Sequence, residues 1–307
     1  MKLLVACCLL FPAGLGAQPA LFDCYVQSAE ARMDARKQFL LADTDTALNE
    51  QIVRGQKIRT IEANGPNPHK IPGGQLYDWV GAAFIPGATL EKLVRMLQDY
   101  DRRAQYFPET ISTSRLLCLS PPDHFRYTMR MKEPAILDVD SDVTWDRLDA
   151  QRWRCRSVST RVAEAGKDHG YLRRLNSYWR FKETEKGVYV EAETITLSDE
   201  FGSMTRMLGS ALMGINPEKS LKHSLTSMRE SVLKPGLEIP KLPGRREKII
   251  VRLFAIKLAG HDCPILNPPV IRVALPAVQG LSVEQRDAFA RASVCGLQEA
   301  EDQTSND

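Results

Sequence analysis

The sequence predicts an α+β fold in which a curved antiparallel β-sheet wraps around a long C-terminal helix. Residues 74–198 hold an amphipathic helix pattern and a series of strand patterns, the last two of which form a hairpin at 171–198. Residues 217–233 then follow a helical pattern. A long amphipathic helix after such strands must bury its apolar stripe on the concave face of the sheet, and a straight helix on a curved sheet leaves space between the two.

The composition is that of an ordinary soluble globular protein. The chain has 307 residues, of which 43% are hydrophobic and 26% are charged. Its formal net charge of +3 is small for this length. Binding to nucleic acid needs clustered Lys and Arg on one face, so we expect no nucleic-acid partner.

The N-terminus has the layout of a secretory signal peptide. Lys2 supplies a positive charge, residues 3–10 form an apolar run, and residues 11–17 contain a proline and several small residues. The apolar run is too short to be a permanent membrane anchor. We therefore expect a signal peptide at 1–17, cleaved after Ala17, and an exported protein that is periplasmic or secreted.

Five cysteines remain after such a cleavage: Cys24, Cys118, Cys155, Cys263 and Cys295. An odd number leaves at least one thiol free or paired with another molecule. The pair that we favour is Cys263–Cys295, and the alternative is that all five are reduced and buried. The sequence has no CxxC motif and its five histidines are scattered, so we expect no metal site and no cofactor.

Two helical patterns, at 26–41 and 46–61, precede the main domain. The residues between them supply N-cap candidates. Pro66 and Pro68 end this part, because two prolines so close together cannot continue a helix. We expect an N-terminal helical hairpin over residues 18–64.

The predicted main domain covers residues 74–234. A first strand at 74–84 leads into an amphipathic helix at 88–100, whose apolar residues fall on one face. Four more strands follow, at 110–119, 124–132, 135–148 and 152–162. Apolar and polar residues alternate cleanly in the second of these, as on a strand with one buried face.

The hairpin at 171–198 comes next, and we expect it at the closing edge of the sheet. Gly187 follows its turn, where it can take a left-handed conformation. The final helix has Asn216 as its N-cap and Pro217 in the favoured first position. Its apolar residues fall on one stripe: Leu221, Leu225, Met228 and Val232.

The composition changes after the final helix. Prolines and a glycine at 235–244 form a linker, a strand-like segment covers 248–258, and a short helix is expected at 282–294. We expect a small α/β extension over 235–297 and a disordered acidic tail over 298–307.

Residues 76–229 resemble the START-like, or SRPBCC, superfamily, which has the helix-grip fold. The similarity lies in phrases such as FIPGATLEKLVRMLQDYDRRAQYFPE at 84–109 and WRCRSVSTRVAE at 153–164, and in the hairpin; they resemble exported bacterial members of unassigned function. It implies a hydrophobic small molecule or lipid bound between the sheet and the C-terminal helix. The superfamily also includes hormone receptors, cyclases and dioxygenase subunits, but the iron-ligand and cluster motifs of the last are missing.

Large apolar side chains at strand spacing are the candidate ligand-binding residues: Tyr127, Met129, Trp145, Trp179 and Phe181. They either line a hydrophobic pocket or form ordinary core under the final helix. Met207 is a further candidate, in a methionine-rich apolar run at 201–215. This run is either an adaptable lid over the ligand or a packed loop.

Glu191 and Glu193 are the only candidates for a catalytic role. They lie two residues apart on a strand, so their carboxylates share a face about 7 Å apart. Such a pair suits general acid–base chemistry if it faces a cleft. The alternative is a solvated outer face, where Arg161, Arg174 and Arg180 are the obvious partners.

Three functions remain open from the sequence. The first is an exported binding or carrier protein for a hydrophobic small molecule or lipid. The second is a cyclase or hydrolase that uses Glu191 or Glu193 as its base. The third is a periplasmic interaction module, whose protein partner the sequence does not identify. Arg152, Arg154 and Arg156 share one strand face, which either meets an anionic head group or membrane surface or is simply solvated.

Overall fold

The computed structural model describes residues 17–120, 123–132, 136–164, 171–199, 216–237 and 239. The chain divides into two compact units, Met1–Leu117 with Pro121–Lys241 and Cys118–Ser120 with Leu242–Asp307. The sheet, the helices and the site described below belong to the first unit, apart from the last residues of one strand.

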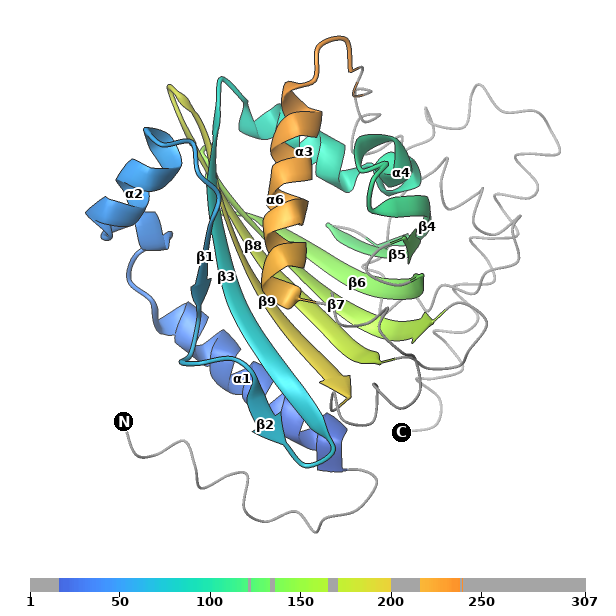
Figure 1. Ribbon diagram of the computed structural model, residues 1–307. Coiled ribbons are helices and arrows are strands. Elements are labelled where there is room, and N and C mark those ends of the chain that lie inside the picture. Colours follow the sequence, from blue (N-terminus) through green and yellow to red (C-terminus); the bar gives the residue numbers. More distant parts are fainter. Residues whose placement is uncertain are drawn as a thin grey trace, which may run out of the picture. The chain divides into compact units, whose positions relative to one another are not determined.

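The described residues form one nine-stranded sheet in the order β1-β3-β9-β8-β7-β6-β5-β4, with β2 paired to β3. The sheet curves around a long helix, which confirms the predicted α+β fold (Figure 1). The strands are β1 Arg59–Glu62, β2 His69–Ile71, β3 Gly74–Pro86, β4 Ile111–Ser120, β5 His124–Met131, β6 Leu137–Arg147, β7 Arg152–Glu164, β8 Leu172–Thr184 and β9 Gly187–Asp199.

The hairpin β8–β9 lies inside the sheet, so its predicted place at the closing edge was wrong. β9 pairs with β3 along its whole length, from Gly74 opposite Asp199 to Pro86 opposite Gly187. Its other side pairs with β8. The partner of β9 is thus a strand about a hundred residues earlier in the chain, and a pattern along the sequence does not reveal such a long-range pairing.

Five α-helices accompany the sheet in the described residues: α1 Ala17–Ala35, α2 Thr46–Val53, α3 Leu90–Gln98, α4 Arg103–Tyr106 and α6 Pro217–Leu233. Two short 3₁₀ turns, η2 Leu41–Asp43 and η3 Tyr100–Arg102, precede α2 and α4. We call the face of the sheet that carries α6 the inner face, and the opposite face, which carries α1, the outer face (Figure 1).

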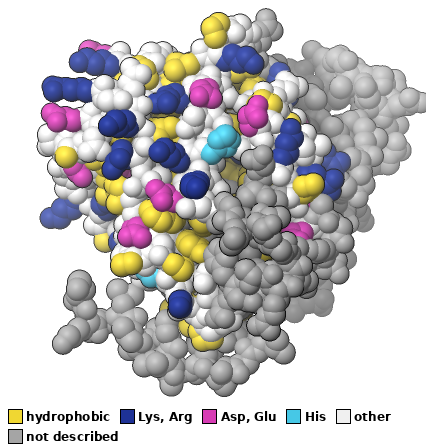
Figure 2. Space-filling view, in the orientation of Figure 1, with side chains coloured by type: hydrophobic (Ala, Val, Ile, Leu, Met, Phe, Trp, Pro, Cys, Tyr) yellow, Lys and Arg dark blue, Asp and Glu magenta, His cyan; other side chains and the backbone are white. Residues whose placement is uncertain are grey.

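Helix α6 begins and ends where the sequence predicts. The Asn216 side chain accepts a hydrogen bond from the backbone N–H of Lys219, and Pro217 occupies the first turn. The predicted stripe is buried. Gly81 on β3 permits this contact, because a Cβ atom there would lie 2.6 Å from Leu225 Cδ1. Around the helix, Lys and Arg side chains are interspersed with acidic and hydrophobic ones (Figure 2).

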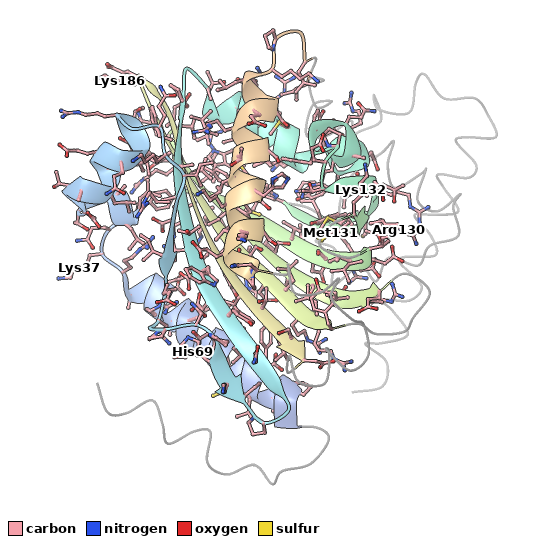
Figure 3. The ribbon with its side chains drawn as sticks, in the orientation of Figure 1. Lys37, His69, Arg130, Met131, Lys132 and Lys186 are labelled. Atoms are coloured by element: carbon pink, nitrogen blue, oxygen red, sulfur yellow. The ribbon has the colours of Figure 1, made fainter. Side chains whose placement is uncertain are left out.

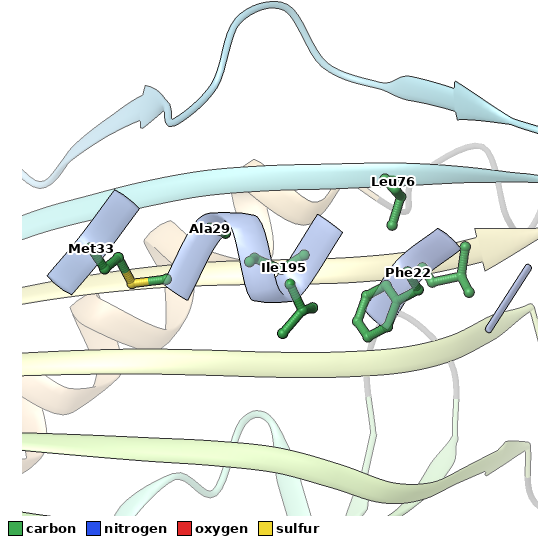
Figure 4. Close-up of a cluster of buried hydrophobic side chains, with 7 residues drawn as sticks. Phe22, Ala29, Met33, Leu76 and Ile195 are labelled. Carbon is green, nitrogen blue, oxygen red and sulfur yellow. The ribbon is translucent and has the colours of Figure 1, made fainter. Parts of the chain in front are cut away.

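Helix α1 packs on the outer face of β3 and β9. Its apolar residues, spaced three or four apart, form a cluster with three strand residues (Figure 4): Phe22, Val26, Ala29, Met33, Leu76, Ile195 and Leu197. The helix covers Ala17–Ala35 rather than the expected 26–41. It therefore begins at the predicted cleavage point, while residues 1–16 of the predicted signal peptide lie outside the described residues.

The second N-terminal helix is shorter than predicted. Helix α2 ends at Val53, and the expected helical stretch to Ile61 instead turns at Gly55 and enters strand β1, which pairs with β3. The helical prediction used Leu48, Ile52, Ile58 and Ile61, yet Ile61 packs against Leu48 and Ile52 from a strand. A pattern of apolar residues does not distinguish these two cases when the segment is short.

Several predictions from the sequence fall outside the described residues. These are the Cys263–Cys295 pair, the methionine-rich run with Met207, most of the extension over 235–297 and the tail over 298–307. Cys118 is disulfide-bonded, and Cys155 is a buried free thiol. In the described part of the chain, no helix is long and apolar enough to cross a membrane.

Candidate ligand-binding cavity

A cavity of about 400 Å³ lies between the inner face of the sheet and α6. This volume is within the range of pockets that hold small organic ligands. Strands β5 to β9 form most of its floor, α6 forms its roof with residues between Pro217 and Met228, and Leu97 of α3 and Phe107 after α4 line one end. Successive residues of a strand face opposite sides, so alternate residues of each strand line the cavity.

Five of the six predicted ligand-binding residues line this cavity: Tyr127, Met129, Trp145, Trp179 and Phe181. The sixth, Met207, is outside the described residues. Trp145 and Phe181 stack with their ring centres 5.7 Å apart, and Phe181 continues the stack to Trp179 at 6.3 Å. The indole N–H of Trp145 donates a hydrogen bond of 2.9 Å to Tyr100. These contacts make one end of the cavity aromatic and fix its side chains.

A row of hydroxyl groups crosses the middle of the floor. Ser157 on β7 lies opposite Ser177 on β8, and Ser177 lies opposite Thr194 on β9. All three line the cavity. Thr196, two residues further along β9, also lines it, and its Oγ1 is buried without a hydrogen-bond partner in the described part of the chain. The sequence alone does not reveal this row, because its residues align only when the register between the strands is known.

The other end of the floor is mainly aliphatic, with one tyrosine. Leu137 and Tyr171 are buried there, with Met129, Met131 and Leu172 packed against them. Figure 3 labels Met131 at the end of β5, beside Arg130 and Lys132. Along the sheet, the floor therefore passes from aromatic rings through hydroxyl groups to aliphatic side chains.

The described residues that line the cavity include no Asp or Glu. They include three basic side chains: Arg103 from α4, and Lys219 and His223 from the N-terminal half of α6. No group of three or more His, Cys, Asp or Glu side chains that could hold a metal ion occurs among the residues described.

Glu191 and Glu193 lie on the outer face, beneath α1, and do not line the cavity. They are not solvated either, since they are only 5% and 7% exposed. Glu193 pairs with Arg32 of α1, and Glu191 pairs with Arg36, which directly follows the end of α1. Of the partners expected from the sequence, Arg180 alone is close, with Nη1 3.6 Å from Oε1 of Glu191.

Asp78 of β3 completes this buried acidic group. Its Oδ2 accepts hydrogen bonds from the Tyr25 hydroxyl at 2.9 Å and from Arg32 at 3.1 Å. Burial, together with the nearby Asp78 carboxylate, raises the pKa of Glu193 to about 7, although Arg32 opposes this shift. The sequence alone does not reveal Arg32 and Arg36 as partners, because only the fold brings α1 and the residues after it to the sheet.

The three arginines on one face of β7 form ordinary surface ion pairs. Arg152 pairs with Asp149 at 2.7 Å, Arg154 with Asp146 at 2.8 Å and Arg156 with Glu30 at 2.7 Å. Each arginine side chain is about half exposed. Their charges are thus matched by acidic neighbours, which is the solvated-face alternative considered above.

The first long strand, β3, lies beside the last strand, β9, and the curved sheet holds α6 above the cavity. This is a helix-grip fold. Neither a protein-family model nor a curated protein matches the chain. The helix-grip description therefore rests on the strand order and on the place of α6.

Among solved structures, the chain is similar to a STAR-related lipid transfer protein from Xanthomonas axonopodis, with 14% identity, 54% of this chain and 97% of that chain covered, and a TM-score of 0.40. It is similar to human STARD10, with 10% identity, 74% and 91% covered, and a TM-score of 0.39. It is also similar to the di-domain ARO/CYC BexL from the BE-7585A biosynthetic pathway, with 15% identity, 72% and 63% covered, and a TM-score of 0.39.

Proposed function

We propose that this protein binds a hydrophobic small molecule or lipid in the cavity between the sheet and α6. The observation that carries the proposal is the cavity itself, about 400 Å³ in volume and lined mainly by aromatic and aliphatic side chains. Such a space is costly to keep empty, because its lining loses packing contacts. A bound apolar molecule restores these contacts and gains from its own removal from water.

Binding is better supported than catalysis. A cyclase or hydrolase of the kind considered above needs a carboxylate that reaches the substrate. The described lining residues contain none, and Glu191 and Glu193 are engaged by arginines on the other side of the sheet. The hydroxyl row can instead donate and accept hydrogen bonds with a polar substituent of a ligand.

The direct test is to look for a bound molecule in the purified protein. Native mass spectrometry and solvent extraction should find a co-purifying hydrophobic compound, and the extracted protein should take up a fluorescent fatty acid. A matched pair of variants locates the site. Ser157→Phe fills the floor of the cavity and should abolish uptake, whereas Thr144→Phe places the same ring on an exposed outer-face position of the neighbouring strand and should not. An apo mass together with no uptake would refute the proposal.

We also propose that the protein acts outside the cytoplasm, after removal of a signal peptide. The layout of residues 1–17 supports this, and cleavage after Ala17 would leave the packing residues of α1 intact, since the first of them is Phe22. Cell fractionation should find the protein outside the cytoplasm, with Gln18 at its N-terminus. Retention in the cytoplasm with an unprocessed N-terminus would contradict export without affecting the ligand proposal.

A further inference from the structure

We propose that the ligand is an amphiphile whose anionic group is bound by Arg103 inside the cavity. This inference rests on the proposed function and names the chemical class of its ligand. The anionic group is a carboxylate or a phosphate, attached to an apolar chain or ring system that lies along the aromatic part of the floor.

Arg103 lines the cavity and is held in place by its neighbours. It is the first residue of α4, and its side chain lines the cavity. The guanidinium carbon lies 4.7 Å from the centre of the Tyr100 ring and 4.8 Å from that of Tyr127. One guanidinium nitrogen, Nη2, donates a 2.9 Å hydrogen bond to the carbonyl of Leu97. Two aromatic rings and a carbonyl thus hold the charged group in place without neutralising it.

The charge of Arg103 has no acidic partner among the described residues. Its Nε is buried and has no hydrogen-bond partner there. The adjacent Arg102 differs, because it forms an ion pair of 2.7 Å with Asp99. A buried donor without an acceptor is costly, and an arginine cannot relieve the cost by losing its proton. An anionic group of the ligand in contact with the guanidinium would balance its charge.

The positive charge of Arg103 lies close enough to the floor of the cavity to affect the pKa values of groups there. Burial raises the pKa of the Cys155 thiol and of the Tyr100 hydroxyl, and in both cases nearby Arg103 opposes the increase. Cys155 lies on β7 between Trp145 and Trp179 in the sheet register. An anionic group at Arg103 therefore lies next to the aromatic rings that would contact the apolar part of the same molecule.

Arginine suits this role because its planar guanidinium presents parallel N–H donors to carboxylate and phosphate oxygens. The cavity volume of about 400 Å³ lies near the lower end of the range for ligand pockets. This favours a molecule with one apolar chain or a small ring system. The hydroxyl groups of Ser157, Ser177 and Thr194 remain available to a second polar substituent.

The test uses the purified full chain, freed of lipid, with 1-aminoanthracene as a neutral fluorescent reporter of the cavity. Dodecanoic acid, dodecyl phosphate and methyl dodecanoate then compete with it at pH 7.5. They share one chain and differ in charge. We expect the acid, the phosphate or both to bind at least about tenfold more tightly than the ester, as a charge-assisted hydrogen bond implies. Tighter binding of dodecanoic acid indicates that the natural ligand is a free acid. Tighter binding of dodecyl phosphate indicates that it is a lipid phosphate.

Variants assign the preference to one residue. Arg103→Met should lose the preference for the anions, so that its affinities for the acid, the phosphate and the ester become similar. Arg102→Met removes a neighbouring charge that does not line the cavity, and should keep the preference. Arg103→Lys keeps the charge but loses the planar fork, so its preference should be reduced. A thermal melt of each variant identifies any that do not fold.

Two results would overturn the inference: equal affinity of the wild type for the ester and both anions, or an unchanged preference in folded Arg103→Met. The wild-type comparison is decisive even if that variant does not fold. Binding of the ester alone would refute the anionic group and leave the proposed function standing. If no competitor and no reporter binds, the proposed function fails, and the role of Arg103 fails with it.

Discussion

Glu193 is an acidic residue in surroundings that do not favour its charged form. A carboxylate that is 7% exposed and next to a second carboxylate is destabilising, and the ion pair with Arg32 of α1 offsets part of this cost. Its pKa rises from an ordinary value of 4.5 to about 7 for this reason. The folded protein therefore holds the Glu193 proton more tightly than the unfolded chain does.

The first prediction concerns pH. Since the folded-state pKa of Glu193 is raised, its contribution to the free energy of unfolding is fully present below about pH 4.5 and is lost as the pH rises to about 7. The slope from this one group is at most about 1.4 kcal/mol per pH unit. Glu193→Gln should remove this part of the pH dependence, as measured by urea denaturation between pH 5 and pH 8. Glu185→Gln, at an exposed turn, should leave the slope unchanged; an unaltered slope in Glu193→Gln would refute the assignment.

Gly81 carries the second prediction at this scale. Gly81→Ala places a methyl group against Leu225 and Leu221, so it should destabilise the fold by about 1–3 kcal/mol through overpacking. Combining it with Leu225→Ala creates room for that methyl group. The double variant should then lose less stability than the sum of the two single variants, measured in a double-mutant cycle. Strict additivity would mean that α6 can move away from β3 at little cost.

At the scale of elements, helix α1 is an integral layer of the fold and not a separate attachment. It buries the outer-face residues Leu76, Ile195 and Leu197, and its Arg32, together with Arg36 directly after the helix, supplies counter-charges to the acidic group beneath it. An interaction role for the N-terminal helices would thus have to use their exposed side. Their removal would expose both the apolar cluster and the acidic group.

The third prediction tests this role of α1. Val26→Asp introduces an unpaired carboxylate into the apolar cluster and should reduce the free energy of unfolding by at least about 3 kcal/mol. Gln27→Asp introduces an aspartate on the exposed side of the same helix turn. It should change the free energy of unfolding by less than about 0.5 kcal/mol. Chemical denaturation measures both. Equal stability of the two variants would show that α1 is not firmly packed.

Elements with local signals were predictable from the sequence. Helix α6 was placed by Asn216, Pro217 and its apolar stripe, and the strands β4 to β9 were placed by their alternation. The pairing of β9 with β3 was not predictable, because it depends on contacts between distant parts of the chain. Strand β1 was misread as helix, since Ile58 and Ile61 happen to continue the spacing of α2.

The same division holds for the site. The aromatic wall follows from alternation within single strands, so Trp145, Trp179 and Phe181 were found from the sequence. The direction in which Glu191 and Glu193 point was not found from the sequence. Both faces of β9 are buried, so alternation alone does not tell which face of the strand lines the cavity. The hydroxyl row can be recognised only when the register of three strands is known. The place of Arg103 can be recognised only when the fold of the segment after α3 is known.

At the scale of the whole molecule, a ligand in the cavity should act as part of the core. A ligand present at one hundred times its dissociation constant stabilises a protein by about 2.7 kcal/mol if it binds only the folded state. The fourth prediction is a corresponding rise in melting temperature on addition of dodecanoic acid. The rise should be absent in Ser157→Phe and present in Thr144→Phe. A rise in both variants would place the binding site elsewhere.

Strand β9 has the cavity on its inner face and the residues packed under α1 on its outer face, so only one backbone separates them. Thr194 and Thr196 face the cavity, while Glu193 and Ile195 face α1. Occupation of the cavity and the protonation of Glu193 therefore act on opposite sides of the same strand. The affinity for a neutral ligand should accordingly be measured at more than one pH.

The aromatic wall also gives the protein an optical property. Two of its four tryptophans, Trp145 and Trp179, line the cavity, stacked through Phe181, while the other two, Trp79 and Trp153, are not among its lining residues. Ultraviolet emission from the unlabelled protein should therefore change in wavelength or intensity when water next to these indoles is displaced. Occupancy could then be followed in real time without a dye, and replacing Trp145 and Trp179 with Phe would assign the signal to them.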